Sequence, residues 1–504
     1  MLYDCVIRGG RIIDGGGGAP YFADLAIKDG KIAAIGGGFE AKSVIDAGGL
    51  TVSPGFIDSH SHADNAILTH PEMREKLEQG ITTAIAGQCG TSPAPRAENG
   101  GIRTMGEFLR QARGIPLGCH IACFVGHNAI RRTVLGMQDR APDGQELRQM
   151  CALLREALEG GAYGMSLGLY YAPGSYAGRE ELLALTEVLA ERDGVLSAHI
   201  RSESRTALEA GEELLSLARA SGVRTVHSHV KATGEENAGK LERLLEGIDR
   251  ANAEGARVWC DVYPYTAAHT SLSASFVPRS LHADGRLLEN LRDPAKRELA
   301  KEHVRQIYRA DEYSWVLVVS AKNRPDCIGK TLSEIASERG CDPLDAAYDI
   351  ILDSGNAAGA CTFRMRECDV RRALSHPRAM LCTDASVAKG SLSYHPRLRA
   401  AFPRAIGRYA RDEGLVPLPE IIRRATALPA EVYGLAGKGR IREGYDADLV
   451  LFDAERFIDR AEYLDCTAGC EGLRFVLVAG EVAVLDGVAN GTRKGRLLLR
   501  TENS

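Results

Sequence analysis

The stretch Gly55-Phe56-Ile57-Asp58-Ser59-His60-Ser61-His62 follows a short apolar run that begins at Thr51 and is broken by Pro54-Gly55. This pattern predicts the end of a buried strand. Residues two apart on an extended strand project to the same side, so His60 and His62 can face one ion together. An isolated His-x-His pair is often a pair of ordinary surface or core histidines, and the rest of the chain has to decide between the two interpretations.

Length and composition limit the possible domain organisation, partners and cellular setting. The 504 residues can hold a barrel of about 250 residues and a smaller domain. A net charge of −5 argues against nucleic acid or an anionic membrane as partner and favours a small molecule. Thirteen scattered cysteines and an N-terminus without a signal-peptide pattern predict a reducing, cytoplasmic setting. We expect a soluble protein. The sequence leaves open whether the protein forms a homo-oligomer.

The two ends of the chain share one pattern of apolar and polar residues. Residues 1–53 alternate apolar and polar positions between Gly-rich turns, and the same pattern returns in Asp448 to Phe452 and in Phe475 to Ala483. Alternation of this kind is typical of strands and hairpins. We therefore expect residues 1–53 and 435–504 to form one small β-sandwich domain.

Between the ends, an apolar strand, a loop and a helix repeat several times. Examples are Gly161 to Ser166 followed by Arg179 to Arg192, and Val195 to His199 followed by Arg205 to Ala220. Such alternation predicts parallel strands with crossover helices. We expect the α/β fold of a TIM-like (β/α)₈ barrel over residues 54–434, in which reactive residues sit where strands end.

The strand–loop–helix repeat is interrupted at approximately residues 275–375, before the expected eighth strand. The pattern predicts a helix over Pro294 to Arg309, a strand over Ser314 to Ser320 and a helix over Thr331 to Gly340. We expect an insertion that caps the substrate and excludes water from it. A surface excursion without substrate contact is the alternative.

Metal-ligand residue types stand at several strand ends. Cys89 follows the strand that ends at Ala86, His199 and His229 follow two later strands, and Asp384 follows another apolar run. A free cysteine is usually a small buried hydrophobe, and an aspartate after a strand is often a helix cap. Together with the His-x-His pair, however, the set has the donors that zinc prefers.

With these residues in place, the sequence resembles the amidohydrolase superfamily and, within it, the N-acyl-D-amino-acid deacylases, or D-aminoacylases. The resemblance covers nearly the whole chain. It rests on Pro54-Gly55-Phe56-Ile57-Asp58-Ser59-His60-Ser61-His62, Gly87-Gln88-Cys89-Gly90, Gly164-Met165-Ser166-Leu167-Gly168, His199-Ile200-Arg201, Ser228-His229-Val230-Lys231, Asp261-Val262-Tyr263-Pro264-Tyr265, His395-Pro396-Arg397 and Gly444-Tyr445-Asp446-Ala447-Asp448.

The resemblance implies a metal site that holds one or two Zn²⁺ ions. Its ligands would be the side chains of His60, His62, Cys89, His199 and His229. Many other amidohydrolases bridge two metals with a carboxylated lysine at the fourth strand, but the region Gly161 to Leu169 contains no lysine. The Cys89 thiolate would instead offset the positive charge of the metal and fix the geometry of the ligands. The motif leaves His227 outside the ligand set, as a supporting or core residue.

The resemblance also implies a reaction, the hydrolysis of the amide bond of N-acyl-D-amino acids. We expect attack by metal-bound hydroxide, with Asp384 as general base and then as general acid toward the leaving amine. One alternative is a cyclic-amide hydrolase of the hydantoinase or dihydroorotase kind. Another is a metal-free scaffold or interaction protein on the same fold.

The substrate carboxylate needs a cationic partner, and a guanidinium can bind it in two places at once. Arg397 is the candidate, and by resemblance Lys231 and Tyr263 help to hold the carboxylate. Arg279 occupies a place near the start of the cap where similar proteins often carry an apolar or aromatic residue. This substitution predicts an acidic side chain on the substrate.

Overall fold

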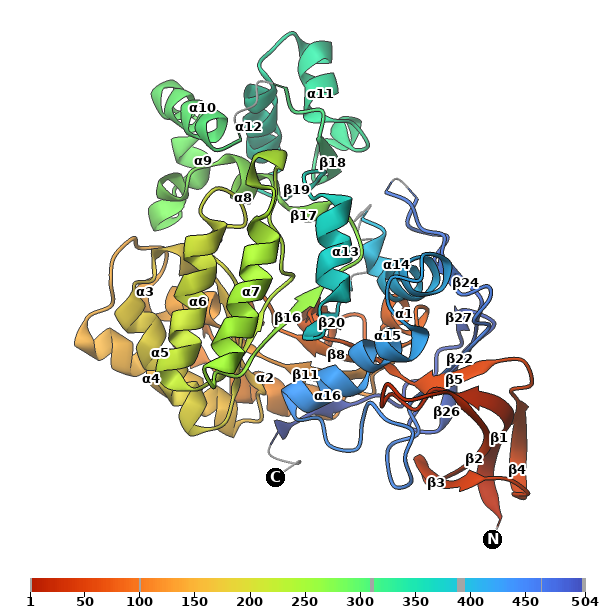
Figure 1. The fold of residues 1–504 in the computed structure, drawn as a ribbon. Coiled ribbons are helices and arrows are strands. Elements are labelled where there is room, and N and C mark those ends of the chain that lie inside the picture. Colours follow the sequence, from red (N-terminus) through yellow and green to blue (C-terminus); the bar gives the residue numbers. More distant parts are fainter. Residues whose placement is uncertain (1, 99–100, 309–311, 388–394, 464, 501–504) are drawn as a thin grey trace.

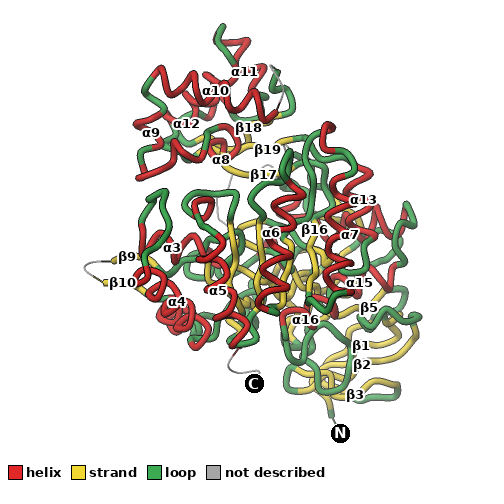
Figure 2. The backbone as a smooth tube through the Cα atoms, turned by 60° about the vertical axis from the view of Figure 1, so that its left-hand side comes forward, coloured by secondary structure: helices red, strands yellow, loops and turns green. Residues whose placement is uncertain are grey.

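The computed structural model describes residues 2–98, 101–308, 312–387, 395–463 and 465–500. Their core is a barrel of parallel strands surrounded by helices (Figures 1 and 2). The barrel strands are β6 (Phe56–Asp58), β8 (Ile81–Ala86), β11 (His120–Cys123) continued by β12 (Val125–Gly126), β13 (Gly164–Gly168), β14 (Val195–His199), β15 (Arg224–His227), β16 (Val258–Val262) and β20 (Ala379–Leu381). The predicted (β/α)₈ fold class is confirmed.

The last strand closes the barrel against the first. The Ser59 amide donates a 3.3 Å hydrogen bond to the carbonyl oxygen of Leu381, and the Ser59 hydroxyl donates one of 2.8 Å to the same oxygen. Just beyond, β7 (Ser61–His62) pairs in parallel with β21 (Ala385–Ser386). The chain segments that carry His62 and Asp384 therefore lie side by side.

The outer helices bury apolar faces against these strands. They are α2 (Met105–Ala112), α3 (His127–Leu135), α4 (Gly144–Glu159), α5 (Arg179–Glu191), α6 (Ala207–Ser221), α7 (Lys240–Ala253), α13 (Glu367–Ser375), α14 (Arg397–Arg404), α15 (Leu418–Ala425) and α16 (Ala427–Tyr433), with the short α1 (Arg74–Leu77). The Asp143 side chain accepts hydrogen bonds from the first-turn amides of α4, which fixes where that helix begins. Every described helix is too short or too polar to cross a bilayer.

Strands from both ends of the chain share one sheet, as predicted. Its order is β27-β26-β25-β22-β5-β1-β2-β3, and β4 pairs with β1. The strands are β1 (Tyr3–Ile12), β2 (Tyr21–Lys28), β3 (Lys31–Gly36), β4 (Ala41–Asp46), β5 (Thr51–Pro54), β22 (Leu449–Phe452), β25 (Leu473–Val478), β26 (Glu481–Leu485) and β27 (Val488–Ala489). The chain then returns to the barrel, where β28 (Leu497–Leu498) pairs with β11. The domain boundaries themselves stay a prediction.

A buried ion pair joins this sheet to the barrel. Asp448, just before β22, accepts a 2.6 Å hydrogen bond from Lys438 and lies 3.3 Å from the His120 ring on β11. The Ala479 amide donates a further hydrogen bond of 2.8 Å to Asp448 Oδ1. Burial opposes the charge of Asp448, but Lys438, His120 and the Ala479 amide together outweigh burial and hold the pKa of this carboxyl well below its usual value.

The insertion between β16 and β20 stands above the barrel (Figure 1). An antiparallel sheet at its base has β19 (Ala358–Thr362) between β17 (Ala268–Ser271) and β18 (Val316–Ala321). Its helices are α8 (Leu272–Phe276), α9 (Leu287–Asn290), α10 (Pro294–Tyr308), α11 (Leu332–Arg339) and α12 (Pro343–Asp353), which enclose a separate apolar core. α10, β18 and α11 lie within two residues of the predicted ranges, apart from Arg309, which lies outside the described residues.

Candidate metal centre and cavity

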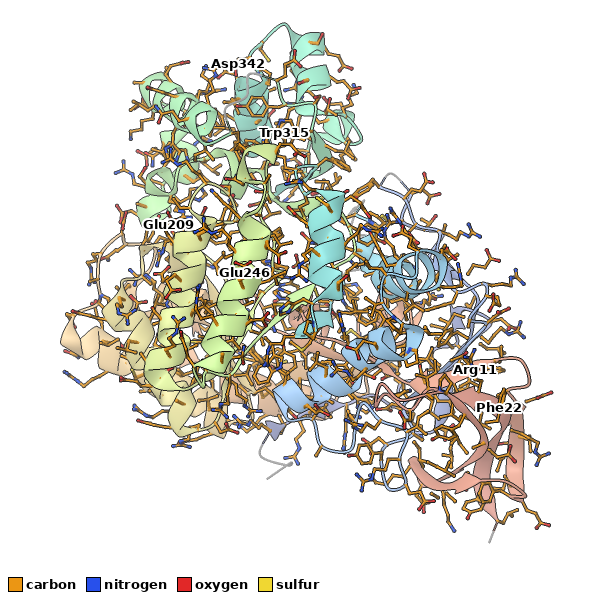
Figure 3. All side chains as sticks on the ribbon, viewed as in Figure 1. Arg11, Phe22, Glu209, Glu246, Trp315 and Asp342 are labelled. Atoms are coloured by element: carbon orange, nitrogen blue, oxygen red, sulfur yellow. The ribbon has the colours of Figure 1, made fainter. Side chains whose placement is uncertain are left out.

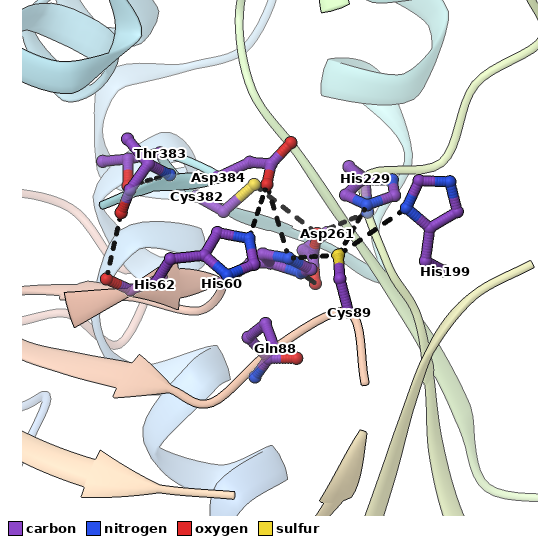
Figure 4. A network of polar contacts seen from close by, with 12 residues as sticks. His60, His62, Gln88, Cys89, His199, His229, Asp261, Cys382, Thr383 and Asp384 are labelled. Carbon is purple, nitrogen blue, oxygen red and sulfur yellow. Dashed lines mark hydrogen bonds and ion pairs between the residues drawn. The ribbon is translucent and has the colours of Figure 1, made fainter. Parts of the chain in front are cut away.

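Six side chains with metal-binding atoms meet at the carboxyl end of the barrel strands (Figure 4). They come from the ends of five barrel strands, β6, β8, β14, β15 and β20, and are all among the residues predicted from the sequence. The set is His60, His62, Cys89, His199, His229 and Asp384. They form two groups that share Cys89, and within each group the ligand atoms lie within 4.8 Å of one another.

The Cys89 sulfur is the centre of this arrangement. It lies 3.3 Å from His60 Nε2, 3.6 Å from His199 Nδ1 and 3.4 Å from His229 Nε2. Burial opposes ionisation of the thiol, but the charges of His60 and His229, together with hydrogen bonds from His199 and His229, outweigh burial and hold the pKa of Cys89 well below its usual value. A thiolate is the form in which cysteine binds metal.

Glycines bring Cys89 to this position. Cys89 has a positive φ of 52°, and Gly87 before it has a φ of 82°. A Cβ atom on Gly87 would lie 2.3 Å from the carbonyl oxygen of Phe124, and one on Gly90 would lie 2.2 Å from the Asn128 side-chain oxygen. The Gly-x-Cys-Gly pattern is therefore a requirement of the tight turn after β8.

The second group adds His62 and Asp384. Asp384 Oδ1 lies 3.2 Å from His62 Nε2 and 3.5 Å from His60 Nε2. The ring nitrogens that face the centre are Nε2 of His60, His62 and His229 and Nδ1 of His199. Buried imidazoles, a thiolate and a carboxylate are the donors that zinc prefers, so the residues present fit a zinc site.

Asp384 is held as a charged group. Arg397 Nη1 donates a 2.7 Å hydrogen bond to Asp384 Oδ2, and the Asp384 amide donates one of 2.9 Å to the carbonyl oxygen of His60. Burial favours the protonated carboxyl, but Arg397, His229, His62 and His60 together outweigh burial and hold the pKa of Asp384 well below its usual value. The carboxylate is therefore ionised at neutral pH and able to accept a proton.

Two carboxylates that sequence reasoning missed support the histidines. Glu203 Oε1 lies 3.0 Å from His229 Nδ1 and 3.5 Å from His199 Nε2. Asp261 Oδ2 lies 3.6 Å from His60 Nδ1, and its Oδ1 accepts a 2.6 Å hydrogen bond from the His229 amide. Carboxylates in such positions orient metal-binding imidazoles. Glu203 follows β14, and Asp261 lies near the end of β16 (Val258–Val262). Their position at the ends of barrel strands is the sequence signal that could have identified them.

The histidine that sequence reasoning left outside the ligand set is also absent from both groups of candidate metal ligands. His227 ends β15, is buried and lies at a groove between α6 and α7. Burial lowers the pKa of His227 to about 3, so the ring is neutral.

A cavity of about 360 Å³ opens beside the candidate metal centre. The predicted carboxylate-binding residues Lys231, Tyr263 and Arg397 all line it. The Tyr263 ring is their common contact, with Arg397 Cζ 4.6 Å and Lys231 Nζ 5.6 Å from its centroid. Lys231 is also paired with Glu203, at 2.6 Å.

The insertion supplies the outer wall of this cavity, through residues that include Tyr308, Trp315 and Arg364. Arg279 is not among the described residues that line it. Its guanidinium binds the carbonyl oxygen of Arg201 and lies 5.9 Å from the centroid of the Tyr170 ring. The structure therefore brings together all the predicted site residues except Arg279.

Comparisons with known proteins agree with this geometry. A model of the amidohydrolase family matches residues 43–484. The chain is 35% identical to the N-acyl-D-glutamate deacylase of Alcaligenes xylosoxydans xylosoxydans, over 99% of this chain and 96% of that one. It is 34% identical to the D-aminoacylase of the same organism, over 99% and 98%. A crystal structure of N-acyl-D-glutamate deacylase from Bordetella bronchiseptica, complexed with zinc and a phosphonate mimic of the tetrahedral intermediate, superposes with a TM-score of 0.85 at 34% identity, covering 99% and 100%.

Proposed function

The chain belongs to the amidohydrolase family, and we propose that it is a zinc-dependent deacylase that hydrolyses the amide bond of N-acyl-D-amino acids. The observation that carries this proposal is the meeting of the six candidate metal ligands with two cationic side chains, Lys231 and Arg397, in one cavity. The names of the full-length relatives support the substrate class.

The metal would be held by His60, His62, Cys89, His199 and His229. Zinc supplies Lewis-acid chemistry in such a site, polarising a carbonyl group and lowering the pKa of bound water from 15.7 to about 7. The chain contributes the orientation of the imidazoles, through the Glu203 and Asp261 carboxylates.

Asp384 moves the proton. Its carboxylate lies beside His60 and His62, where it accepts a proton from the attacking water. It then passes this proton to the amide nitrogen as the C–N bond breaks, because an amine leaves readily only when protonated. The products are a carboxylic acid and a free D-amino acid.

Lys231, Tyr263 and Arg397 bind the α-carboxylate of the substrate. The two positive charges attract it, and the Tyr263 ring keeps both side chains in place through the cation–π contacts described above. A fixed carboxylate limits the positions that the acyl carbonyl can take, which converts binding into correct orientation.

The experiment is an activity screen of purified protein with N-acetyl-D- and N-acetyl-L-amino acids, hydantoin and dihydroorotate. We expect cleavage of the D-series. In Asp384→Asn, turnover should fall at least about 100-fold while the zinc content stays near that of the wild type. Cleavage of cyclic amides alone would favour the hydantoinase-like alternative. Absence of both zinc and activity would favour the scaffold.

A further inference from the structure

Arg364 stands out in the part of the cavity wall that the insertion supplies. It follows β19, and its side chain is 13% exposed. The guanidinium carbon lies 4.7 Å from the ring centroid of Trp315, which Figure 3 marks in the insertion, and 5.3 Å from that of Tyr308. Contacts with two rings hold the planar group in one orientation before any ligand arrives.

The hydrogen bonds of Arg364 are incomplete. Nη2 donates a 2.6 Å bond to the Glu236 carboxylate, at one edge of the guanidinium. Nε is buried and has no hydrogen-bond partner among the described residues. A buried donor without an acceptor is unfavourable, so the protein neighbours of Arg364 leave part of its hydrogen-bonding capacity unused, while the residue lines the cavity.

The chemistry of the donor identifies the acceptor. A guanidinium binds a planar carboxylate through two parallel N–H groups more readily than it binds a single neutral oxygen. Lys231 and Arg397, which line the same cavity, already provide for one carboxylate in the proposed function. Arg364 is a further cation lining this cavity, and its partner Glu236 is 35% exposed, so solvent weakens the charge compensation that Glu236 provides.

Building on the proposed deacylase function, we propose that Arg364 binds a second carboxylate of the substrate and thereby selects N-acyl-D-amino acids that carry two carboxylates. This carboxylate can stand on the amino-acid side chain or at the end of the acyl group. The two sources present the same group to the same guanidinium. Substrates that carry the second carboxylate at one position or the other distinguish them.

The test compares matched substrates. N-acetyl-D-glutamate is paired with its neutral isostere N-acetyl-D-glutamine, and N-succinyl-D-alanine with N-acetyl-D-alanine. In the wild type we expect kcat/KM to favour the charged member of one pair by about tenfold or more, the size typical of a hydrogen bond to a charged group. In Arg364→Gln the ratio should fall to near one, mainly through KM, with the neutral substrates affected little.

Arg279→Gln is the matched control, because Arg279 is also a half-buried arginine of the insertion stacked on a tyrosine but does not line the described cavity. It should keep the wild-type ratio. If Arg364→Gln does not fold, Arg364→Lys keeps the charge beside Glu236 without the planar group, and the ratio should fall in this variant.

The outcomes separate two failures. If the wild type cleaves no N-acyl-D-amino acid, the proposed function is wrong and the inference falls with it. If it cleaves them but neither pair shows a preference, or the preference survives in Arg364→Gln, only the role of Arg364 is contradicted. An equal loss of preference in Arg279→Gln would likewise remove the specific assignment.

Discussion

Replacing Glu203 by Gln tests whether the carboxylates behind the histidines hold the metal centre together. One oxygen of Glu203 lies 2.6 Å from Lys231 Nζ, 3.0 Å from His229 Nδ1 and 3.5 Å from His199 Nε2. Glutamine keeps the shape of the side chain but removes the charge that orients both rings. Loss of such a support typically weakens metal binding by 10- to 100-fold, or about 1.4 to 2.7 kcal/mol.

The assay is a zinc titration of metal-stripped protein against a competing chelator. Glu213→Gln is the matched control, because Glu213 pairs with Arg201 at 2.9 Å in the same part of the barrel but is 25% exposed and outside the cavity. We expect the zinc affinity to fall in Glu203→Gln and to stay unchanged in Glu213→Gln. Equal affinities of Glu203→Gln and wild type would refute the supporting role.

Two further predictions concern stability. In Lys76→Met, the fully buried Asp58 loses its 2.8 Å partner, and we expect the free energy of unfolding, measured with denaturant, to fall by about 3 to 5 kcal/mol. The double variant with Asp58→Asn should recover part of this stability. An unchanged free energy of unfolding in Lys76→Met would contradict the prediction. Because the pKa of Asp448 is depressed in the folded protein, its contribution is fully present above the unfolded value of about 4 and is lost as the pH falls below it. Asp448→Asn should therefore lower stability at pH 7 and flatten the acid dependence, and a wild-type acid profile in this variant would count against the ion pair.

The sequence predicts the parts of the site that follow from local rules. Cys89 requires glycines beside it because its turn has positive φ, and His60 and His62 are recognisable because they end an apolar strand. Strand and helix ranges such as those of β14 and α4 follow from periodicity and capping residues. Each of these features depends on residues within its own short segment of the chain.

The parts that were missed depend on contacts between distant segments. Glu203 is one acidic residue in a loop, and only the fold brings it to His229. The prediction for Arg279 placed an arginine in the insertion but could not tell which arginine of this region faces the cavity. That depends on the pairing of β17 with β19, across about 90 residues of chain, and such non-local pairing has no local sequence signature.

We expect the histidines at the strand ends, and not buried histidines in general, to hold zinc. The most direct measurement is the zinc content of purified, folded wild type, His229→Asn and His227→Asn after dialysis against a weak chelator. His229 lies 3.4 Å from the Cys89 sulfur, whereas His227, two residues earlier, lies at the groove between α6 and α7. We predict that the wild type and His227→Asn retain zinc and that His229→Asn loses most of it; equal zinc contents in the two variants, or none in the wild type, would contradict the claim.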